Sequence, residues 1–156
     1  MASDSSFLVE RSTVIQASPE KIHSLLDNFQ KWRSWSPWED ADPELKRTYS
    51  GPDSGVGASY AWSGNRKAGA GSMVITGSKP GQIVVLDLVF TKPFKAQNVT
   101  TFTIEPGPNG SEVTWAMTGK NNLFFRLVGK VFPMDKLVGK DFEKGLAKMK
   151  VEAEKA

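Results

Sequence analysis

The chain has 156 residues and a mass of 17.1 kDa, with 20 basic and 17 acidic side chains and a formal charge of +3. Its length suits one domain with a substantial core, and 39 % hydrophobic with 24 % charged residues is typical of a globular rather than a disordered chain. The absence of cysteine excludes disulfides, thiolate zinc sites, iron–sulfur clusters and cysteine nucleophiles, and any histidine chemistry depends on the single His23.

The first thirty residues have the pattern of a strand followed by a short helix. Phe7–Gln16 is rich in β-branched and aromatic residues, which favours a strand. Ser18 and Pro19 suit the cap and first turn of a helix that ends near residues 28–31. The apolar stripe of this helix is formed by Ile22, Leu25, Leu26 and Phe29.

A tryptophan cluster follows, with Trp32, Trp35 and Trp38 inside seven residues. Three interpretations stand beside one another. The cluster plugs one end of the fold, lines a pocket, or forms an exposed apolar patch.

The middle of the chain predicts six short strands separated by turn sequences. They are expected at Leu45–Ser50, Ala58–Ser63, Gly71–Ser78, Gln82–Lys92, Ala96–Glu105 and Ser111–Thr118. Glycine, proline and asparagine gather in the gaps, as in residues 51–55 and 106–110. Such short connections favour an antiparallel meander.

Two apolar helical patterns close the chain. Residues 121–134 are strongly apolar, and Asp135–Glu154 has the spacing of a long amphipathic helix. The stripe of the long helix is formed by Val138, Phe142, Leu146, Met149 and Ala153. Because one helix does not cover a flat sheet of seven strands, the sheet is expected to curl around it and leave a hollow.

Period-two alternation assigns one face of each strand to this hollow. The predicted ligand-binding residues are Tyr60, Trp62, Met73, Ile75, Leu86, Leu88, Phe90, Phe102, Trp115, Met117, Phe142, Leu146 and Met149. The set is large, apolar and aromatic, with a few polar atoms on tyrosine and tryptophan. Large apolar residues of this kind more often form a protein core than a ligand site. Both interpretations hold if the deep end of the hollow is core and its open end is a pocket.

Several short motifs run through nearly the whole chain in a fixed order. They are ASPE at 17–20, WSPW at 35–38, GVGA at 55–58, YAW at 60–62, GAGSM at 69–73, FTKPF at 90–94, VTW at 113–115 and DFEKGL at 141–146. Together they resemble the SRPBCC or START-type superfamily, in its polyketide cyclase/dehydrase-like branch. The resemblance implies an α+β helix-grip fold. Its parts are a curved seven-stranded antiparallel sheet around a long C-terminal helix, two short helices after strand one, and a hydrophobic ligand cavity.

The domain prediction is one START-like ligand-binding domain over residues 1–156, with a flexible N-terminus at 1–5 and the C-terminal helix at 135–154. The first residues lack a signal-peptide pattern, so a cytoplasmic location is expected.

Groups able to do chemistry are few on the predicted lining. Tyr60 and His23 are weak catalytic candidates, since a catalytic histidine needs a partner within hydrogen-bond reach that the sequence does not place. Alternation puts Asp87 on the outer face, and Asp141 is expected to pair with Lys144 on the same helix. No metal and no cofactor are predicted.

The leading hypothesis is non-catalytic binding of a hydrophobic small molecule or lipid in the hollow between sheet and C-terminal helix. The alternatives are a polyketide cyclase or dehydratase, and a protein-interaction module resembling chaperone activators with an exposed patch at 32–38. No nucleic-acid partner is expected, since basic runs interleaved with aromatics are missing. Segment 121–134 is a candidate lid. With Arg126, Lys130, Lys136 and Lys140 near it, weak contact with a membrane surface is also expected.

Overall fold

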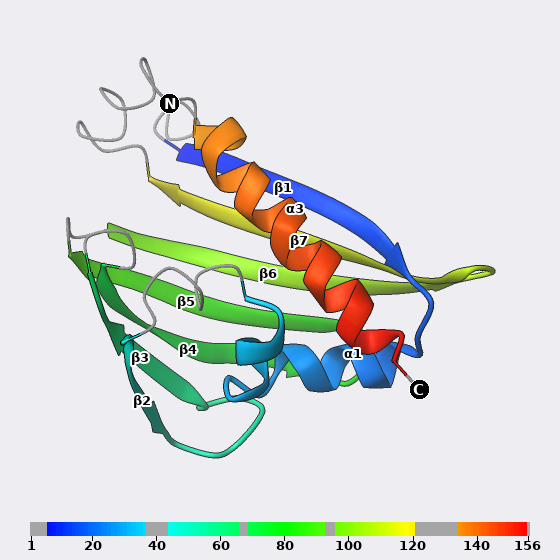
Figure 1. The fold of residues 1–156 in the computed structure, drawn as a ribbon, viewed down its shortest axis with the longest axis horizontal. Helices are drawn as coiled ribbons and strands as arrows, with labels where there is room; N and C mark the ends of the chain where they lie inside the picture. Colours follow the sequence, from blue (N-terminus) through cyan, green and yellow to red (C-terminus); the bar gives the residue numbers. More distant parts are fainter. Residues whose placement is uncertain (1–5, 37–43, 66–68, 93–95, 121–133, 156) are drawn as a thin grey trace.

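The chain runs through one strand, two short helices, six strands and a long helix, as the sequence predicts (Figure 1). The computed structural model describes residues 6–36, 44–65, 69–92, 96–120 and 134–155. The elements are β1 (Ser6–Ile15), α1 (Pro19–Leu26), the 3-10 helix η2 (Lys31–Ser34), β2 (Lys46–Ser50), β3 (Ser59–Ser63), β4 (Ala70–Lys79), β5 (Ile83–Lys92), β6 (Ala96–Gly107), β7 (Gly110–Lys120) and α3 (Met134–Ala153).

The strands form one antiparallel sheet in the order β1-β7-β6-β5-β4-β3-β2. The sheet is curved, α3 crosses its concave side, and α1 lies beside the C-terminal end of α3 on the same side (Figure 1). This arrangement confirms the predicted α+β helix-grip fold. We call the concave side the inner face and the opposite side the outer face.

The turn between β6 and β7 depends on glycine. Gly110 has φ +130°, and a Cβ there would lie 2.4 Å from the carbonyl oxygen of Ile15. Only glycine tolerates both the backbone conformation and this approach. The C-terminal end of β1 therefore lies directly beside the β6–β7 turn, where Ile15 pairs with Ser111.

Helix α1 begins as predicted but ends earlier. The Ser18 side chain accepts a hydrogen bond from the Lys21 backbone N–H, and Pro19 occupies the first turn. The helix ends at Leu26, and indole groups satisfy its last carbonyls. Trp32 Nε1 donates to the Leu26 oxygen at 2.8 Å, and Trp35 Nε1 donates to the Leu25 oxygen at 3.0 Å.

Trp32 and Trp35 therefore plug the interior, and the exposed-patch interpretation is wrong for both of them. Trp35 is fully buried, and Trp32 is 4 % exposed. Burial of the rings and satisfaction of both indole N–H groups explain why two tryptophans are stable there. Trp38 lies outside the described residues.

The deep part of the inner face is packed with aromatic rings. Trp115 stacks on Phe142 of α3 with ring centroids 4.0 Å apart, and Trp35 meets both Trp115 and Phe102 edge-on. We call this region, formed by Trp32, Trp35, Phe102, Trp115 and Phe142, the filled end. It is ordinary core, held from one side by the sheet and from the other by α3 and η2.

Polar contacts hold α3 against β1, among them a hydrogen bond from Lys150 Nζ to the Val14 carbonyl oxygen at 3.2 Å. Arg11 Nε donates to Glu143 Oε2 at 3.1 Å, and the backbone N–H of Gln16 donates to Glu154 Oε2 at 2.8 Å. Gly139 makes room for the Arg11 guanidinium, since a Cβ at this position would lie 2.3 Å from Nη2. Residues 121–133 lie outside the described part of the chain, so the lid and membrane-contact predictions stay predictions.

Candidate functional site

The inner face ends in a row of aromatic side chains on β2, β3 and β5. Tyr49 and Tyr60 have ring centroids 5.3 Å apart, Tyr60 stacks with Trp62 at 6.0 Å, and Trp62 meets Phe90 edge-on at 5.7 Å. We call these four residues the aromatic wall. Cross-strand pairs Tyr49–Tyr60 and Tyr60–Met73 bring the wall together, as period-two alternation requires.

Gly71 on β4 is what allows the wall to close. Gly71 pairs with Trp62 on one side and Phe90 on the other. A Cβ at this position would lie 2.7 Å from Trp62 Cη2 and 2.3 Å from the Val89 carbonyl oxygen. The indole of Trp62 therefore lies across the space that a larger residue would fill.

Burial differs along the inner face. Leu86 and Phe102 are fully buried, whereas Trp62, Leu88 and Phe90 are only half-buried. We call this region, formed by the aromatic wall, Leu88 and Asn98, the open end. Partly exposed large apolar side chains on a concave face are a common feature of ligand-binding sites.

Asn98 is a polar residue of the open end that the sequence interpretation missed. It lies on β6 between Leu88 of β5 and Gly119 of β7, and it is 4 % exposed. Its Oδ1 is buried without a hydrogen-bond partner. The sequence pattern could have identified it, because period-two alternation places Asn98 on the same face of the strand as Thr100 and Phe102.

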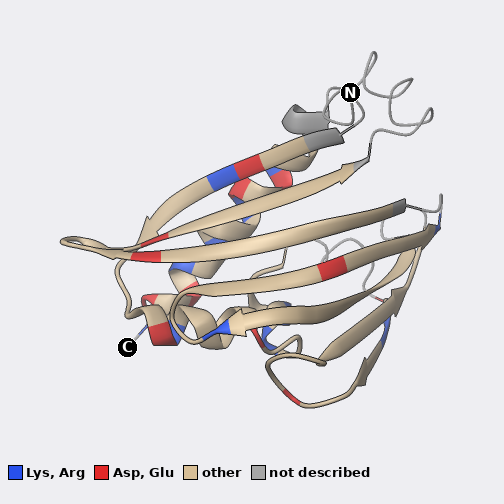
Figure 2. Cartoon of the chain, turned by 180° about the vertical axis from the view of Figure 1, so that it is seen from behind, with Lys and Arg blue, Asp and Glu red and all other residues tan. Residues whose placement is uncertain are grey.

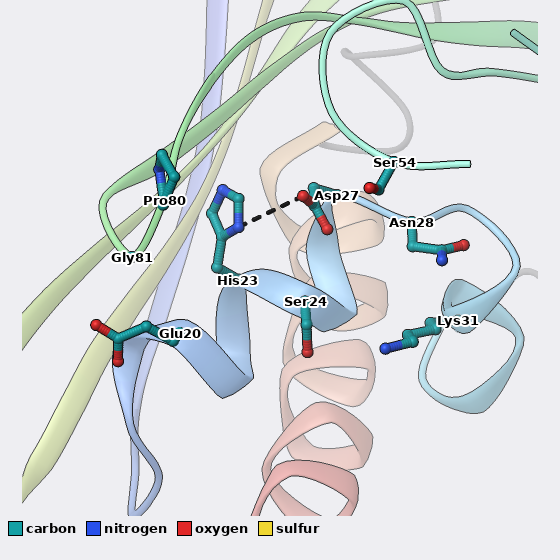
Figure 3. Close-up of a pocket in the computed structure, with 9 residues that line it drawn as sticks. All are labelled: Glu20, His23, Ser24, Asp27, Asn28, Lys31, Ser54, Pro80 and Gly81. Carbon is teal, nitrogen blue, oxygen red and sulfur yellow. Dashed lines mark ion pairs between the residues drawn. The ribbon is translucent and has the colours of Figure 1, made fainter. Parts of the chain in front are cut away.

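The two catalytic candidates belong to different clusters. Tyr60 lies in the aromatic wall, where it also stacks with Phe29 at 5.9 Å. The Nε2 atom of His23 is 3.0 Å from Ser78 Oγ, and its Nδ1 is 3.5 Å from Asp27 Oδ2 (Figure 3). Both nitrogens of the His23 ring are therefore engaged by the protein.

Ser78 reaches His23 because of an irregularity in β4. The register shifts between Ile75 and Gly77, so Ser78 pairs with the buried Val84 and not with an outer-face residue. Such a bulge reverses the side-chain alternation that follows it. The resulting contact ties α1 to the end of β4 and is a structural role for His23.

His23 and Asp27 also border a surface pocket of about 290 Å³ (Figure 3). Its lining residues are Glu20, His23, Ser24, Asp27, Asn28, Lys31, Ser54, Pro80 and Gly81. The lining is polar and mixed in charge, unlike the aromatic wall. Within the described ranges, no three potential metal ligands among histidine, aspartate and glutamate lie close enough to hold an ion.

The perturbed carboxyl groups lie on α3 and directly after its last residue. Burial raises the pKa of Asp141 above its ordinary value, and the nearby charge of Lys144 opposes this effect. The side-chain hydrogen bond from Lys150, aided by the Gln16 backbone N–H, lowers the pKa of Glu154. Asp87 lies on the outer face as predicted, where it pairs with Val99. Seen from behind, charged residues are sparse along the described strands (Figure 2).

The fold and the aromatic wall define a helix-grip protein with an apolar inner face. The chain belongs to the polyketide cyclase/dehydrase and lipid transport family, whose model matches residues 6–154. No curated protein matches it. None of the described helices has the length and apolar character needed to cross a membrane.

Solved structures share the fold at low sequence identity. The chain is similar to protein CV1439 from Chromobacterium violaceum, with TM-score 0.69, 14 % identity, and coverage of 96 % of this chain and 98 % of that one. It is similar to MLL2253 from Mesorhizobium loti, with TM-score 0.63, 19 % identity, and coverage of 97 % and 99 %. The di-domain ARO/CYC StfQ of the steffimycin biosynthetic pathway gives TM-score 0.72 and 12 % identity, covering 98 % of this chain and 52 % of StfQ.

Proposed function

We propose that this protein binds a hydrophobic small molecule or lipid at the open end of the inner face, without catalysing a reaction. The observation that carries the proposal is the half-burial of Trp62, Leu88 and Phe90 on the same face as the fully buried Leu86 and Phe102. Aromatic rings arranged in this way offer a large apolar surface to a ligand at little cost in side-chain entropy.

Binding without catalysis is supported by the separation of the candidate groups. A cyclase or dehydratase needs at least two polar groups converging on the substrate. Tyr60 lies in the aromatic wall, whereas both ring nitrogens of His23 contact Ser78 and Asp27. The cyclase alternative therefore lacks its two proposed groups in one place.

The predicted ligand contacts divide between the two ends. We propose that Tyr60, Trp62, Leu88 and Phe90 touch the ligand directly, with Met73 and Met117 bordering them. The remaining predicted contacts are buried residues of the hydrophobic core. They are Ile75, Leu86, Phe102, Trp115, Phe142, Leu146 and Met149.

Native mass spectrometry of the gently purified protein tests the proposal first, followed by extraction of any bound molecule. The second measurement is a fluorescence titration with the neutral apolar probe N-phenyl-1-naphthylamine. We expect Trp62→Ala to weaken probe binding about tenfold or more, because it removes the centre of the wall. Leu8→Ala is the matched control, since Leu8 is 56 % exposed on the outer face. Equal binding by both variants, or an absence of binding by the parent chain, would contradict the proposal.

A further inference from the structure

Asn98 is a described residue of the inner face whose buried side-chain oxygen lacks a hydrogen-bond partner. It is nine-tenths or more buried, at 4 % exposure. Leu88 flanks it on β5, and on β7 its neighbour Gly119 has no side chain. A polar atom is thus held in an apolar part of the fold.

A buried amide oxygen without a donor destabilises the fold, because it loses its hydrogen bonds to water on folding and forms none within the protein. A leucine at this place would pack without that cost. Buried polar groups left unsatisfied in a native structure often have a functional explanation, and the open end offers one here.

We propose that Asn98 determines ligand specificity by accepting a hydrogen bond from a hydroxyl or N–H group of the bound molecule. This inference rests on the proposed function and names its ligand class. The ligand is a neutral, mostly apolar molecule that carries one donor, such as a phenol or a polycyclic alcohol. The ring system of the ligand packs against the aromatic wall, and Asn98 Oδ1 accepts a hydrogen bond from the ligand's donor group.

The charges of the inner face favour a neutral ligand over a carboxylate. Among the described residues, the cations on this face are Arg11 of β1 and Arg47 of β2, by their pairing with Trp115 and Trp62. Arg11 is bound to Glu143, and Arg47 donates to the Leu45 carbonyl oxygen at 3.3 Å. The register neighbours of Asn98 carry no charge. Within the part of the chain that the structure describes, a carboxylate placed there would meet an acceptor oxygen and no balancing cation.

Three matched probes test the inference by isothermal titration of the full chain: 2-naphthol, 2-methoxynaphthalene and 2-naphthoate. They share the naphthalene ring and differ in its substituent, which is a hydrogen-bond donor in 2-naphthol, an acceptor alone in the methyl ether and an anion in 2-naphthoate. We expect 2-naphthol to bind about tenfold tighter than the methyl ether, and the anion to bind most weakly. This ratio is measured on the unaltered protein, so it does not depend on any variant folding.

Asn98→Leu then assigns the preference to this residue. The dissociation constant of the ether divided by that of 2-naphthol is expected to fall from about ten to about one. The urea concentration at the midpoint of unfolding of the ligand-free protein is expected to rise. A gain in stability with a loss of selectivity distinguishes a ligand contact from a structural polar residue. Thr101→Val is the matched control, because Thr101 faces outward on the same strand and should leave the ratio unchanged.

The outcomes separate the two proposals. If the probes bind with equal affinity, the apolar site stands and the role of Asn98 is overturned. A preference for the ether overturns the acceptor role of Asn98 Oδ1, since the ether only accepts and would have to be bound by a donor such as Asn98 Nδ2. A preference for the anion overturns it as well, since it would require a cation at this place. If none of the probes binds, the proposed function fails and this inference fails with it.

Discussion

The filled end and the open end lie on one face of one sheet, yet they differ in how their polar atoms and rings are satisfied. At the filled end, Trp115 stacks on Phe142, and the indole N–H groups of Trp32 and Trp35 each have a carbonyl partner. At the open end, Trp62 and Phe90 are half-buried, and the Asn98 oxygen lacks a partner. The comparison separates residues that stabilise the fold from residues available for a ligand.

The largest expected effect is at the filled end. Trp115→Ala removes a ring that contacts Trp35, Phe102 and Phe142, so it should lower the free energy of unfolding by about 3–5 kcal/mol. Urea unfolding followed by circular dichroism measures this change. Trp62→Ala should cost clearly less, since Trp62 is only half-buried. Equal losses in the two variants would erase the distinction between the two ends.

A smaller effect is expected where the wall depends on glycine. Gly71→Ala places a methyl group 2.7 Å from Trp62 Cη2 and 2.3 Å from a backbone oxygen, so the indole or the strand must move. We expect a loss of about 1–3 kcal/mol in unfolding free energy, with weaker probe binding.

Gly77→Ala is the control for this change, because its Cβ would meet its nearest neighbour at an ordinary 3.5 Å. It should change probe binding little. Unaltered probe binding by Gly71→Ala would show that the position of Trp62 does not matter to the site.

The next prediction concerns α3, which contributes Phe142 to the filled end. Burial raises the pKa of Asp141, so ionising this carboxyl is harder in the folded chain than in the unfolded one. Its stability contribution is therefore fully present below the ordinary value of 3.8 and lost as pH rises through the folded pKa.

Asp141→Asn should thus be more stable than the parent chain at pH 7, and this gain should vanish below pH 3.8. Thermal unfolding at a series of pH values measures the difference. A gain of the same size at every pH would point to a cause other than the ionisation of Asp141.

The smallest effect is expected at the exposed end of α3. Hydrogen bonds from Lys150 and Gln16 lower the pKa of Glu154, so its contribution is present above the ordinary value of 4.5 and lost as pH falls through the folded pKa. Glu154→Gln should destabilise the fold slightly at pH 7 and not at low pH. Added salt should reduce the difference at pH 7, since the pair is near the surface.

Much of the fold could be predicted because it depends on local patterns. The alternation of β5 correctly assigned Leu86 to the inner face and Asp87 to the outer face. Ser18 and Pro19 correctly marked the start of α1. These features follow from side-chain periodicity and capping, which act over a few residues.

The candidate site was predictable only in part. Tyr60, Trp62 and Phe90 were placed on one face by alternation, but their exposure depends on what packs above each strand. The direction of Ser78 does not follow from simple alternation, because the irregularity after Ile75 reverses it. Asn98 lay within the alternating pattern and was overlooked because an asparagine does not fit an apolar lining.

The sequence alone thus determined the strands and the apolar character of the inner face through side-chain periodicity, and the start of α1 through its capping residues. Its resemblance to a known family indicated the class of fold. Tertiary structure decided which aromatic rings are core and which form a wall. It also decided that His23 is held by Ser78 and Asp27, and that one buried oxygen is left without a donor. These outcomes depend on contacts between residues far apart in the chain, and no local pattern specifies them.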